Sequence, residues 1–360
     1  MSYQRRNIEN MQGYTWGEQP EDGDTIKLNT NENPYPPSPA VAEALAGLDA
    51  QSLRTYPPPT ADRLRDKLAT LHRVARNNIV MTHGGDEGLR LAFTTFVEPG
   101  AAFGMAEPSY SLYPVLAAVH GCRTVKIALD HDWQLPRNFA TQLNEAGANL
   151  ACVVNPHAPS GTLLATDQIS QLANDFAGVL LVDEAYVDFV DPALQHDLTR
   201  LINVFDNLLI LRTFSKGYSL AGLRLGYLIG HQSLIEPMLN KTRDSYNIDL
   251  VSQELGAAAI DDRAHAENSW AAVRQNRRAL REGLIAHGFK VWQSQTNFLL
   301  AEVPLSAPHS AGEIYQALKS RGILIRYFDT PELEDKLRIT VGTADENTQL
   351  LSSLAEILNR

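Results

Sequence analysis

Short apolar runs alternate with helical segments in this 360-residue chain from residue 79 to residue 229. Runs of this length, bounded by polar residues, are typical of buried strands. Because parallel strands need a crossover between them, usually a helix, the alternation predicts an α/β fold. We expect a mostly parallel sheet sandwiched by helices. The runs lie at residues 79–82, 101–106, 123–128, 150–155, 179–182, 208–211 and 225–229.

The stretch LLILRTFSKGYSLAGLRLGYLIG places Lys216 between the last two runs. A lone lysine there would usually be a solvated loop residue. Its neighbours favour another interpretation, because Thr213 and Ser215 supply hydroxyls, a glycine follows, and Arg224 comes eight residues later. Hydroxyls, bare backbone and a guanidinium together suit a phosphate group. A lysine beside a phosphate site suggests a Schiff base with pyridoxal 5'-phosphate.

That cofactor needs a carboxylate that keeps its pyridine nitrogen protonated. Asp183, in VLLVDEAY, ends an apolar run, which in an open parallel sheet is the edge where ligands bind. Asp183 and Lys216 are 33 positions apart, which leaves room for a strand–helix–strand unit. Tyr186 is then placed to reach the ring oxygen of the cofactor. The alternative for Asp183 is a helix N-cap.

The segments SKGYSLAGLRLGY, VDEAYVDF and LRITVGT resemble motifs of the fold-type I pyridoxal-phosphate aminotransferases, most closely the histidinol-phosphate aminotransferases. The resemblance extends from about Tyr14 to Leu358, with the motifs in the expected order. It implies a large cofactor-binding domain and a smaller α+β domain. We expect an N-terminal arm at residues 1–40 that contributes to the small domain, the large domain at 41–262 and the small domain at 263–360.

The resemblance implies further cofactor contacts. The turn at Gly85, Asp86 and Glu87 is expected to hold the phosphate, mainly through backbone N–H groups at a helix start. Tyr110 is expected to stack on the pyridine ring, and its alternative is a core tyrosine. Tyr56, in RTYPPP, is expected to reach the cofactor phosphate of a neighbouring subunit, which implies a homodimer. Its alternative is packing against the prolines.

One segment departs from the family pattern. The family has Asn-Pro-Thr-Gly after its strand, with the asparagine donating to the ring oxygen of the cofactor, whereas this chain has Ala158 at the aligned position. The donor is then Asn155, His157 or Tyr186 alone. We predict Asn155, because it stands at the carboxyl end of its strand.

Substrate contacts follow from the same resemblance. Arg338, in LRITVGT, matches the arginine that binds the anionic group of the substrate, and Arg326 is expected close to it. Asn297 is a candidate for the same cleft. A strand arginine otherwise usually faces solvent. The arm motif LNTNENPYPPSP, which contains Asn31, is expected to line the mouth of the site together with Tyr14. The alternative for the arm is a flexible tail.

The reaction implied is transamination of L-histidinol phosphate with 2-oxoglutarate, giving imidazole acetol phosphate and L-glutamate. Lys216 would move the proton of the substrate, with Asp183 and Tyr186 as the other catalytic residues. An aromatic amino-acid aminotransferase and a lyase similar to threonine-phosphate decarboxylase remain open. A cofactor-sensing domain of a transcription regulator is a third alternative.

The net charge of the chain limits the kinds of partner that it is expected to bind. A net charge of −11 argues against nucleic acid or an anionic membrane as partner, and against the regulator alternative. No run approaches the 18 apolar residues of a membrane helix, and the first residues carry no signal peptide. The two cysteines, Cys122 and Cys152, are expected to be free and buried, as in a reducing cytoplasm. We predict no metal site.

Overall fold

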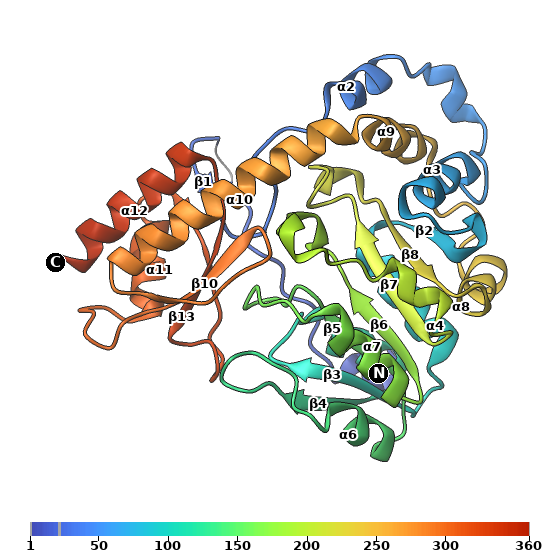
Figure 1. Cartoon of the computed structure of the whole chain (residues 1–360), viewed down its shortest axis with the longest axis horizontal. Helices are drawn as coiled ribbons and strands as arrows, with labels where there is room; N and C mark the ends of the chain where they lie inside the picture. The colour runs from blue at the N-terminus through green and yellow to red at the C-terminus, as the bar shows by residue number, and fades with distance from the viewer. Residues whose placement is uncertain (1, 21–22, 360) are drawn as a thin grey trace.

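A seven-stranded sheet organises the larger part of the computed structural model, which describes residues 2–20 and 23–359 (Figure 1). Its order is β2-β8-β7-β6-β5-β3-β4, and only β8 runs antiparallel to its neighbours. The mostly parallel sheet predicted from the sequence is confirmed. The strands are β2 (Ile79–Thr82), β3 (Ala102–Glu107), β4 (Arg123–Ala128), β5 (Ala148–Val154), β6 (Val179–Asp183), β7 (Leu208–Thr213) and β8 (Gly226–Gly230).

The central strands are buried on both faces, which explains their continuous apolar character. Val182 and Ile210 belong to the hydrophobic cluster on one face, whereas Leu181 and Leu209 belong to the cluster on the other. Consecutive residues of a strand point to opposite faces, so both faces must be covered. The register aligns Val154, Asp183 and Leu211 at one edge. Asp183 therefore stands at the carboxyl edge, as predicted.

Helices cover both faces of this sheet (Figure 1). They are α2 (Pro39–Ala46), α3 (Asp62–His72), α4 (Gly84–Phe96), α5 (Leu112–His120), α6 (Phe139–Glu145), α7 (Thr166–Asp175), α8 (Gln232–Pro237) and α9 (Leu250–Asp261). Shorter turns are η1 (Ala50–Arg54), η2 (Arg76–Asn78), η3 (Val187–Phe189), η4 (Pro192–Leu194), η5 (Thr199–Asn203), η6 (Ala221–Leu223) and the π-helical η7 (Met238–Thr242). Cys152 is buried and Cys122 half-buried, and both are free thiols. In the described part of the chain, none of the helices has the length and apolar composition to cross a membrane.

A second, antiparallel sheet forms the smaller part. Its strand order is β12-β13-β10-β9. The N-terminal arm adds β1, which pairs in parallel with β11. The elements are β1 (Ile26–Lys27), β9 (Lys290–Val291), β10 (Phe298–Glu302), α11 (Ala311–Lys319), β11 (Ile323–Leu324), β12 (Arg326–Tyr327), β13 (Lys336–Thr340) and α12 (Ala344–Leu358). The first turn of the arm, α1 (Arg6–Glu9), instead packs against α5 of the larger part. We propose the domain boundaries at residues 40 and 262, supported by this pairing of the arm and by the helix break at Asp262.

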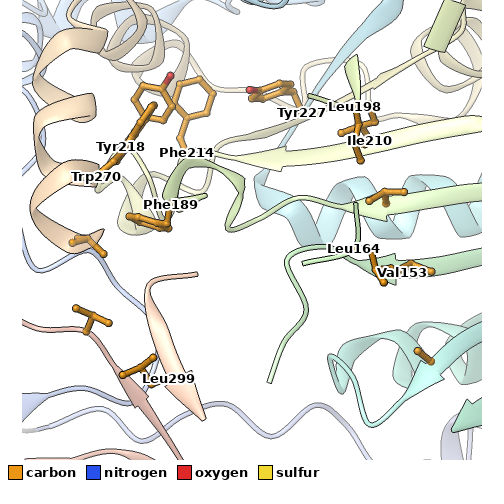
Figure 2. Packing of buried hydrophobic residues seen from close by; sticks show 14 of the residues in the cluster. Val153, Leu164, Phe189, Leu198, Ile210, Phe214, Tyr218, Tyr227, Trp270 and Leu299 are labelled. Carbon is orange, nitrogen blue, oxygen red and sulfur yellow. The ribbon is translucent and has the colours of Figure 1, made fainter. Parts of the chain in front are cut away.

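The 24-residue helix α10 (Arg263–Ala286) runs from beside α9 toward α12 (Figure 1). Trp270 of α10 meets Tyr218 edge-on at 5.6 Å, and Tyr218 packs on Phe214 at 5.0 Å, a group seen in Figure 2. Arg277, which is 5% exposed, donates from Nη1 to the carbonyls of Phe189 (3.1 Å) and Thr296 (2.7 Å). The helix thus joins the segment after β6 to the segment before β10.

We expect Arg277→Met to destabilise the protein by about 2–4 kcal/mol, because it leaves two buried carbonyl groups without a donor. Arg278→Met is the matched control. Arg278 carries a 68% exposed side chain whose ion pair with Asp191 is worth less than about 1 kcal/mol. Urea denaturation of both variants measures the difference. Equal losses would contradict the joining role of Arg277.

Candidate active site

A cavity of about 540 Å³ opens at the carboxyl edge of the large sheet and extends to the smaller part. The predicted site residues that do not line it are Glu87, Asn155, Tyr56 and Asn297. Those that do are Tyr14, Asn31, Gly85, Asp86, Tyr110, Asp183, Tyr186, Thr213, Ser215, Lys216, Arg224, Arg326 and Arg338. The fold thus brings together residues that are more than 300 positions apart.

Lys216 is the third residue after the end of β7, and its amino group faces the arm. Nζ donates to the carbonyl of Thr30 at 2.9 Å. The next carbonyl along the chain, that of Gly217, accepts from Trp270 Nε1 at 2.6 Å and fixes the turn. Burial lowers the pKa of Lys216 to about 8; the carboxylate of Glu32 opposes this shift and the guanidinium of Arg338 adds to it. A buried lysine with this pKa is suited to accept a proton.

Asp183 is a buried carboxylate held by neutral donors. The hydroxyl of Tyr113 donates to Oδ2 at 2.8 Å and the backbone N–H of Ala185 donates to Oδ1 at 3.1 Å. Burial raises the pKa of Asp183 to about 6, although both hydrogen bonds lower it. No basic side chain of the described residues forms an ion pair with it. The site therefore has a negative charge for which the chain supplies no cation, and a protonated ring nitrogen would satisfy it.

Tyr113 is a site residue that sequence reasoning missed. Its ring is fully buried in α5 and meets Tyr110 edge-on at 5.5 Å. Its position three residues after Tyr110 was the available signal, but a tyrosine in an apolar helix is indistinguishable from a core residue.

A second group of polar side chains in the cavity consists of two hydroxyls and a guanidinium, those of Thr213, Ser215 and Arg224. Thr213 Oγ1 donates to Ser215 Oγ at 3.0 Å, and Arg224 Nη1 donates to the same oxygen at 3.3 Å. Gly84 has φ +75°, and a Cβ there would stand 2.7 Å from Arg224 Nη2, so the close approach of the guanidinium requires glycine. Gly85 lies in the first turn of α4, whose free N–H groups suit an anion.

The carboxylate of Glu87 points away from this anion site. It accepts from the backbone N–H of His83 and from Asn247 Nδ2, the latter at 3.0 Å. Asp86, in contrast, lines the cavity and forms an ion pair with Arg224 at 3.4 Å. Any contact of Glu87 with a phosphate would have to come from its backbone, as the sequence indicated.

Asn155 does not reach the cavity, contrary to our prediction. It is fully buried, its Nδ2 donates to the carbonyl of Leu164 at 3.1 Å and its Oδ1 accepts from the N–H of Leu164 at 2.8 Å. This loop closure occupies both ends of the amide. The geometry therefore argues against Asn155 as the ring-oxygen donor.

Tyr186 remains as the candidate for that contact. Its hydroxyl accepts from Asn31 Nδ2 at 3.0 Å, which leaves its own proton available for another acceptor. His157 is engaged elsewhere, since Nδ1 lies 2.7 Å from Ser160 Oγ and Nε2 lies 3.0 Å from the carbonyl of Pro108. Ala158 presents only a methyl group to the cavity wall.

Two tyrosines form an aromatic wall. The rings of Tyr14 and Tyr110 meet edge-on at 5.7 Å, and the hydroxyl of Tyr110 donates to Asp86 at 3.4 Å. Burial, and then the carboxylate of Asp86, raise the pKa of Tyr110 well above its ordinary value, so it stays neutral. This wall offers a ring face of the kind predicted for stacking.

Two guanidiniums mark the end of the cavity in the smaller part. Arg338 and Arg326 lie 5.3 Å and 5.0 Å from the ring of Phe328. Arg338 Nη2 donates to the carbonyl of Asn29 at 3.0 Å, and its buried Nε has no partner among the described residues. Burial lowers the pKa of Arg338, which the hydroxyl of Tyr186 partly offsets. An anionic group fits between these side chains. Asn297 lies outside the cavity lining, and its Nδ2 holds the arm at the carbonyl of Asn31 (2.9 Å).

Tyr56 lies on the surface, away from the cavity of its own chain. Its side chain is 79% exposed and stacks on Tyr246 with ring centroids 4.4 Å apart. In the structure of a single chain, Tyr56 does not lie with the other predicted site residues.

The family described as aminotransferase class I and II matches residues 23–354. The chain belongs to this family. Histidinol-phosphate aminotransferase 1 of Trichormus variabilis is 39% identical over 358 residues, which cover 99% of this chain and 99% of that protein. The histidinol-phosphate aminotransferase of Synechocystis sp. is 40% identical and covers 98% of this chain and 97% of that protein.

Solved structures agree on the fold. The putative histidinol-phosphate aminotransferase of Erwinia carotovora atroseptica superposes with a TM-score of 0.84 at 25% identity, covering 92% of this chain and 96% of that one. The histidinol-phosphate aminotransferase of Sinorhizobium meliloti, solved in complex with pyridoxal-5'-phosphate, gives a TM-score of 0.89 at 21% identity, covering 100% and 98%.

The aminotransferase cavity fits pyridoxal phosphate on three counts. Asp183 lacks a cation, Lys216 has a lowered pKa, and the Ser215–Arg224 end supplies donors for a phosphate. The distribution of charge matches the ring nitrogen, the aldehyde and the phosphate of the cofactor. The chain is a pyridoxal-phosphate-dependent aminotransferase.

We expect Asp183→Asn to stabilise the cofactor-free protein near neutral pH, by roughly 2 °C or more in melting temperature. The raised pKa, from 3.8 to about 6, means that the folded state binds the proton more tightly than the unfolded chain. The free energy of unfolding therefore falls as the pH rises through this window, and the cost of the unpaired carboxylate persists above it. Asparagine has no such cost.

The same variant should gain less stability than the wild type when pyridoxal phosphate is added, because it cannot pair with a protonated ring nitrogen. Differential scanning fluorimetry with and without cofactor measures both effects. An equal gain in the two proteins would count against Asp183 as the partner of the ring nitrogen.

Proposed function

We propose that this enzyme transfers the amino group of L-histidinol phosphate to 2-oxoglutarate, giving imidazole acetol phosphate and L-glutamate in histidine biosynthesis. The names of the full-length relatives support this reaction. The observation that carries it is the pair Arg326 and Arg338 beside Phe328, at the end of the cavity opposite Arg224. Two guanidiniums suit the phosphate of the donor and the side-chain carboxylate of glutamate in turn.

Pyridoxal 5'-phosphate is the cofactor, and when bound it supplies the electron sink for the deprotonated α-carbon. Ser215, Arg224 and the first turn of α4 would hold its phosphate. Asp183, positioned by Tyr113, would pair with the ring nitrogen and keep it protonated. Tyr186, whose hydroxyl accepts from Asn31, would donate a hydrogen bond to the ring oxygen.

Lys216 moves the proton of the reaction. Its amino group would take the proton from the α-carbon of the substrate as a general base and would then give it back on the far side of the substrate nitrogen, two bonds from that carbon, as a general acid. The pKa of about 8 keeps a useful fraction of the amine neutral near physiological pH. The rate is therefore expected to rise with pH over the range in which this amine loses its proton, since protonated Lys216 cannot accept the proton. The turn at Gly217, fixed by Trp270, limits how far the amine can swing.

The assembly that we propose is a homodimer in the cytoplasm. Tyr56 supports it, because a 79% exposed tyrosine stacked on Tyr246 presents its hydroxyl to a second chain. In this arrangement Tyr56 donates to the cofactor phosphate bound by the partner subunit. The leucines Leu45 and Leu53 are also more than half exposed and would be covered by the same contact.

The substrate is tested by a single half-reaction. We expect L-histidinol phosphate to bleach the visible absorbance of the bound cofactor with a second-order rate constant at least about tenfold that of L-phenylalanine, because only the first places a dianion between the arginines. Stopped-flow absorbance gives both constants, and Lys216→Ala, which cannot turn over, is the control. Faster reaction with phenylalanine would indicate an aromatic aminotransferase, and release of carbon dioxide from a phosphorylated amino acid would indicate a lyase.

Tyr56→Phe is expected to weaken retention of pyridoxal phosphate by about tenfold, since it removes one hydrogen bond to a charged group. Tyr246→Phe is the matched control, because it keeps the stack and loses a hydroxyl that has no such role. Spectroscopic titration of the apoenzyme measures both. Hybrid dimers of Tyr56→Phe and Lys216→Ala chains should contain one intact site and retain the cofactor there as the wild type does. Loss of retention in every site of the hybrid would place Tyr56 in the site of its own chain.

A further inference from the structure

Unpaired polar atoms gather where the N-terminal arm meets the small domain. Among the described residues, the buried side-chain nitrogen or oxygen atoms without a hydrogen-bond partner include Asn29 Oδ1, Thr30 Oγ1, Asn297 Oδ1 and Arg338 Nε. Such atoms are rare in folded proteins, and each one needs an explanation. Asn29, Thr30 and Arg338 also line the active-site cavity. A ligand group in the cavity would explain the cluster.

Thr30 has the most informative position of these residues. Its carbonyl accepts from Lys216 Nζ at 2.9 Å, and the preceding carbonyl, that of Asn29, accepts from Arg338 Nη2 at 3.0 Å. Its methyl group packs against Gly17, where a Cβ would stand 2.5 Å from Thr30 Cγ2 and 3.9 Å from Arg326 Nη1. The side chain of Thr30 therefore lies beside Arg326, with its methyl fixed and its hydroxyl unpaired.

The number of donors matters for the choice of anion. A carboxylate offers two oxygens, which one guanidinium fork can satisfy. A phosphate monoester offers three terminal oxygens and almost two negative charges, so it needs a further donor. The unpaired hydroxyl of Thr30 is a neutral donor on a residue whose surroundings include both guanidiniums. The preceding carbonyl accepts from Arg338, and Gly17, on which the methyl group of Thr30 packs, lies next to Arg326.

We propose that the hydroxyl of Thr30 donates to the phosphate of the substrate and makes this end of the cavity select phosphate monoesters over carboxylates. This inference rests on the proposed function for the identity of the phosphorylated donor. Thr30 thereby determines specificity, while its carbonyl positions Lys216. Binding satisfies a hydroxyl that burial otherwise leaves unpaired.

The test is Thr30→Val in the cofactor-loaded enzyme, with Thr30→Ser as the matched variant. Valine keeps the methyl group on Gly17 and the backbone carbonyl but removes the hydroxyl. We expect kcat/KM for L-histidinol phosphate to fall about 10- to 100-fold, mainly through KM, because a hydrogen bond to a charged group is lost. For L-glutamate the loss should be less than about threefold. Serine should restore most of the preference for the phosphorylated donor.

Inorganic phosphate provides a second measurement, which does not depend on the amino donor. We expect its competitive inhibition constant against L-glutamate to rise about tenfold or more in Thr30→Val and to stay near the wild-type value in Thr30→Ser. Unchanged constants for both phosphate and histidinol phosphate would overturn the proposal. Equal losses for L-glutamate and L-histidinol phosphate would also overturn it, because they would assign Thr30 a structural role only.

The two hypotheses fail in different ways. A wild type that does not react with L-histidinol phosphate, while phosphate inhibition still depends on the Thr30 hydroxyl, would reject the proposed substrate and keep the phosphate contact. A wild type that prefers L-histidinol phosphate, with no effect of Thr30→Val, would keep the substrate and reject the contact. The visible spectrum of the bound cofactor and the melting temperature report whether each variant folds.

Discussion

The burial of Asp183 without a cationic partner is the constraint on which the rest of the site depends. A lone carboxylate inside a protein is costly, and the chain offsets only part of this cost with the hydroxyl of Tyr113 and the N–H of Ala185. The rest has to come from a cation that the chain does not provide. The rigid apolar strands β5, β6 and β7 hold the carboxylate at the sheet edge, where a bound ring can approach but bulk water is largely excluded. If Asp183 pairs with the ring nitrogen, as we propose, the empty protein loses some stability so that the cofactor binds in one protonation state.

The N-terminal arm connects this edge of the large sheet to the smaller part of the molecule through hydrogen bonds. Its backbone accepts from Lys216 and Arg338, and Leu28 accepts from the N–H of Thr340 at 3.0 Å. Asn31 adopts φ +56°, a left-handed conformation that asparagine tolerates, and this turn lets its side chain reach Tyr186. Lys216, the proposed base, follows a strand of the large sheet, and Arg338, the proposed substrate arginine, lies in the small sheet. Two adjacent carbonyls of the arm accept from both side chains, so a segment that looks like a polar tail in the sequence connects the two halves of the cavity.

Local patterns were enough to predict the sheet, the edge position of Asp183 and the lysine loop. Apolar runs predict buried strands, and a charged residue at the end of such a run is easily recognised in the sequence. The contacts of Tyr113 and Thr30 could not be predicted because they exist only after folding, when a core-like tyrosine meets Asp183 and a loop threonine meets Gly17. Asn155 was wrongly placed at the cavity because the sequence does not reveal that its amide closes the loop to Leu164. The proposed role of Tyr56 needs a second chain, so neither the sequence nor the structure of one subunit is enough to test it.

The two anion sites also act on the base between them. The guanidiniums of Arg338 and Arg224 both lower the pKa of Lys216, after burial, which is the larger cause. If, as we propose, the phosphate of the cofactor neutralises Arg224 and the anionic group of the substrate neutralises Arg338, both of these contributions weaken and the pKa of the free Lys216 amine rises. The amine then binds a proton more tightly than in the empty site, which suits it to hold the proton that it takes from the substrate. A chain with a net charge of −11 would in this way attract anions locally through three arginines, and their binding would tune the proton affinity of Lys216.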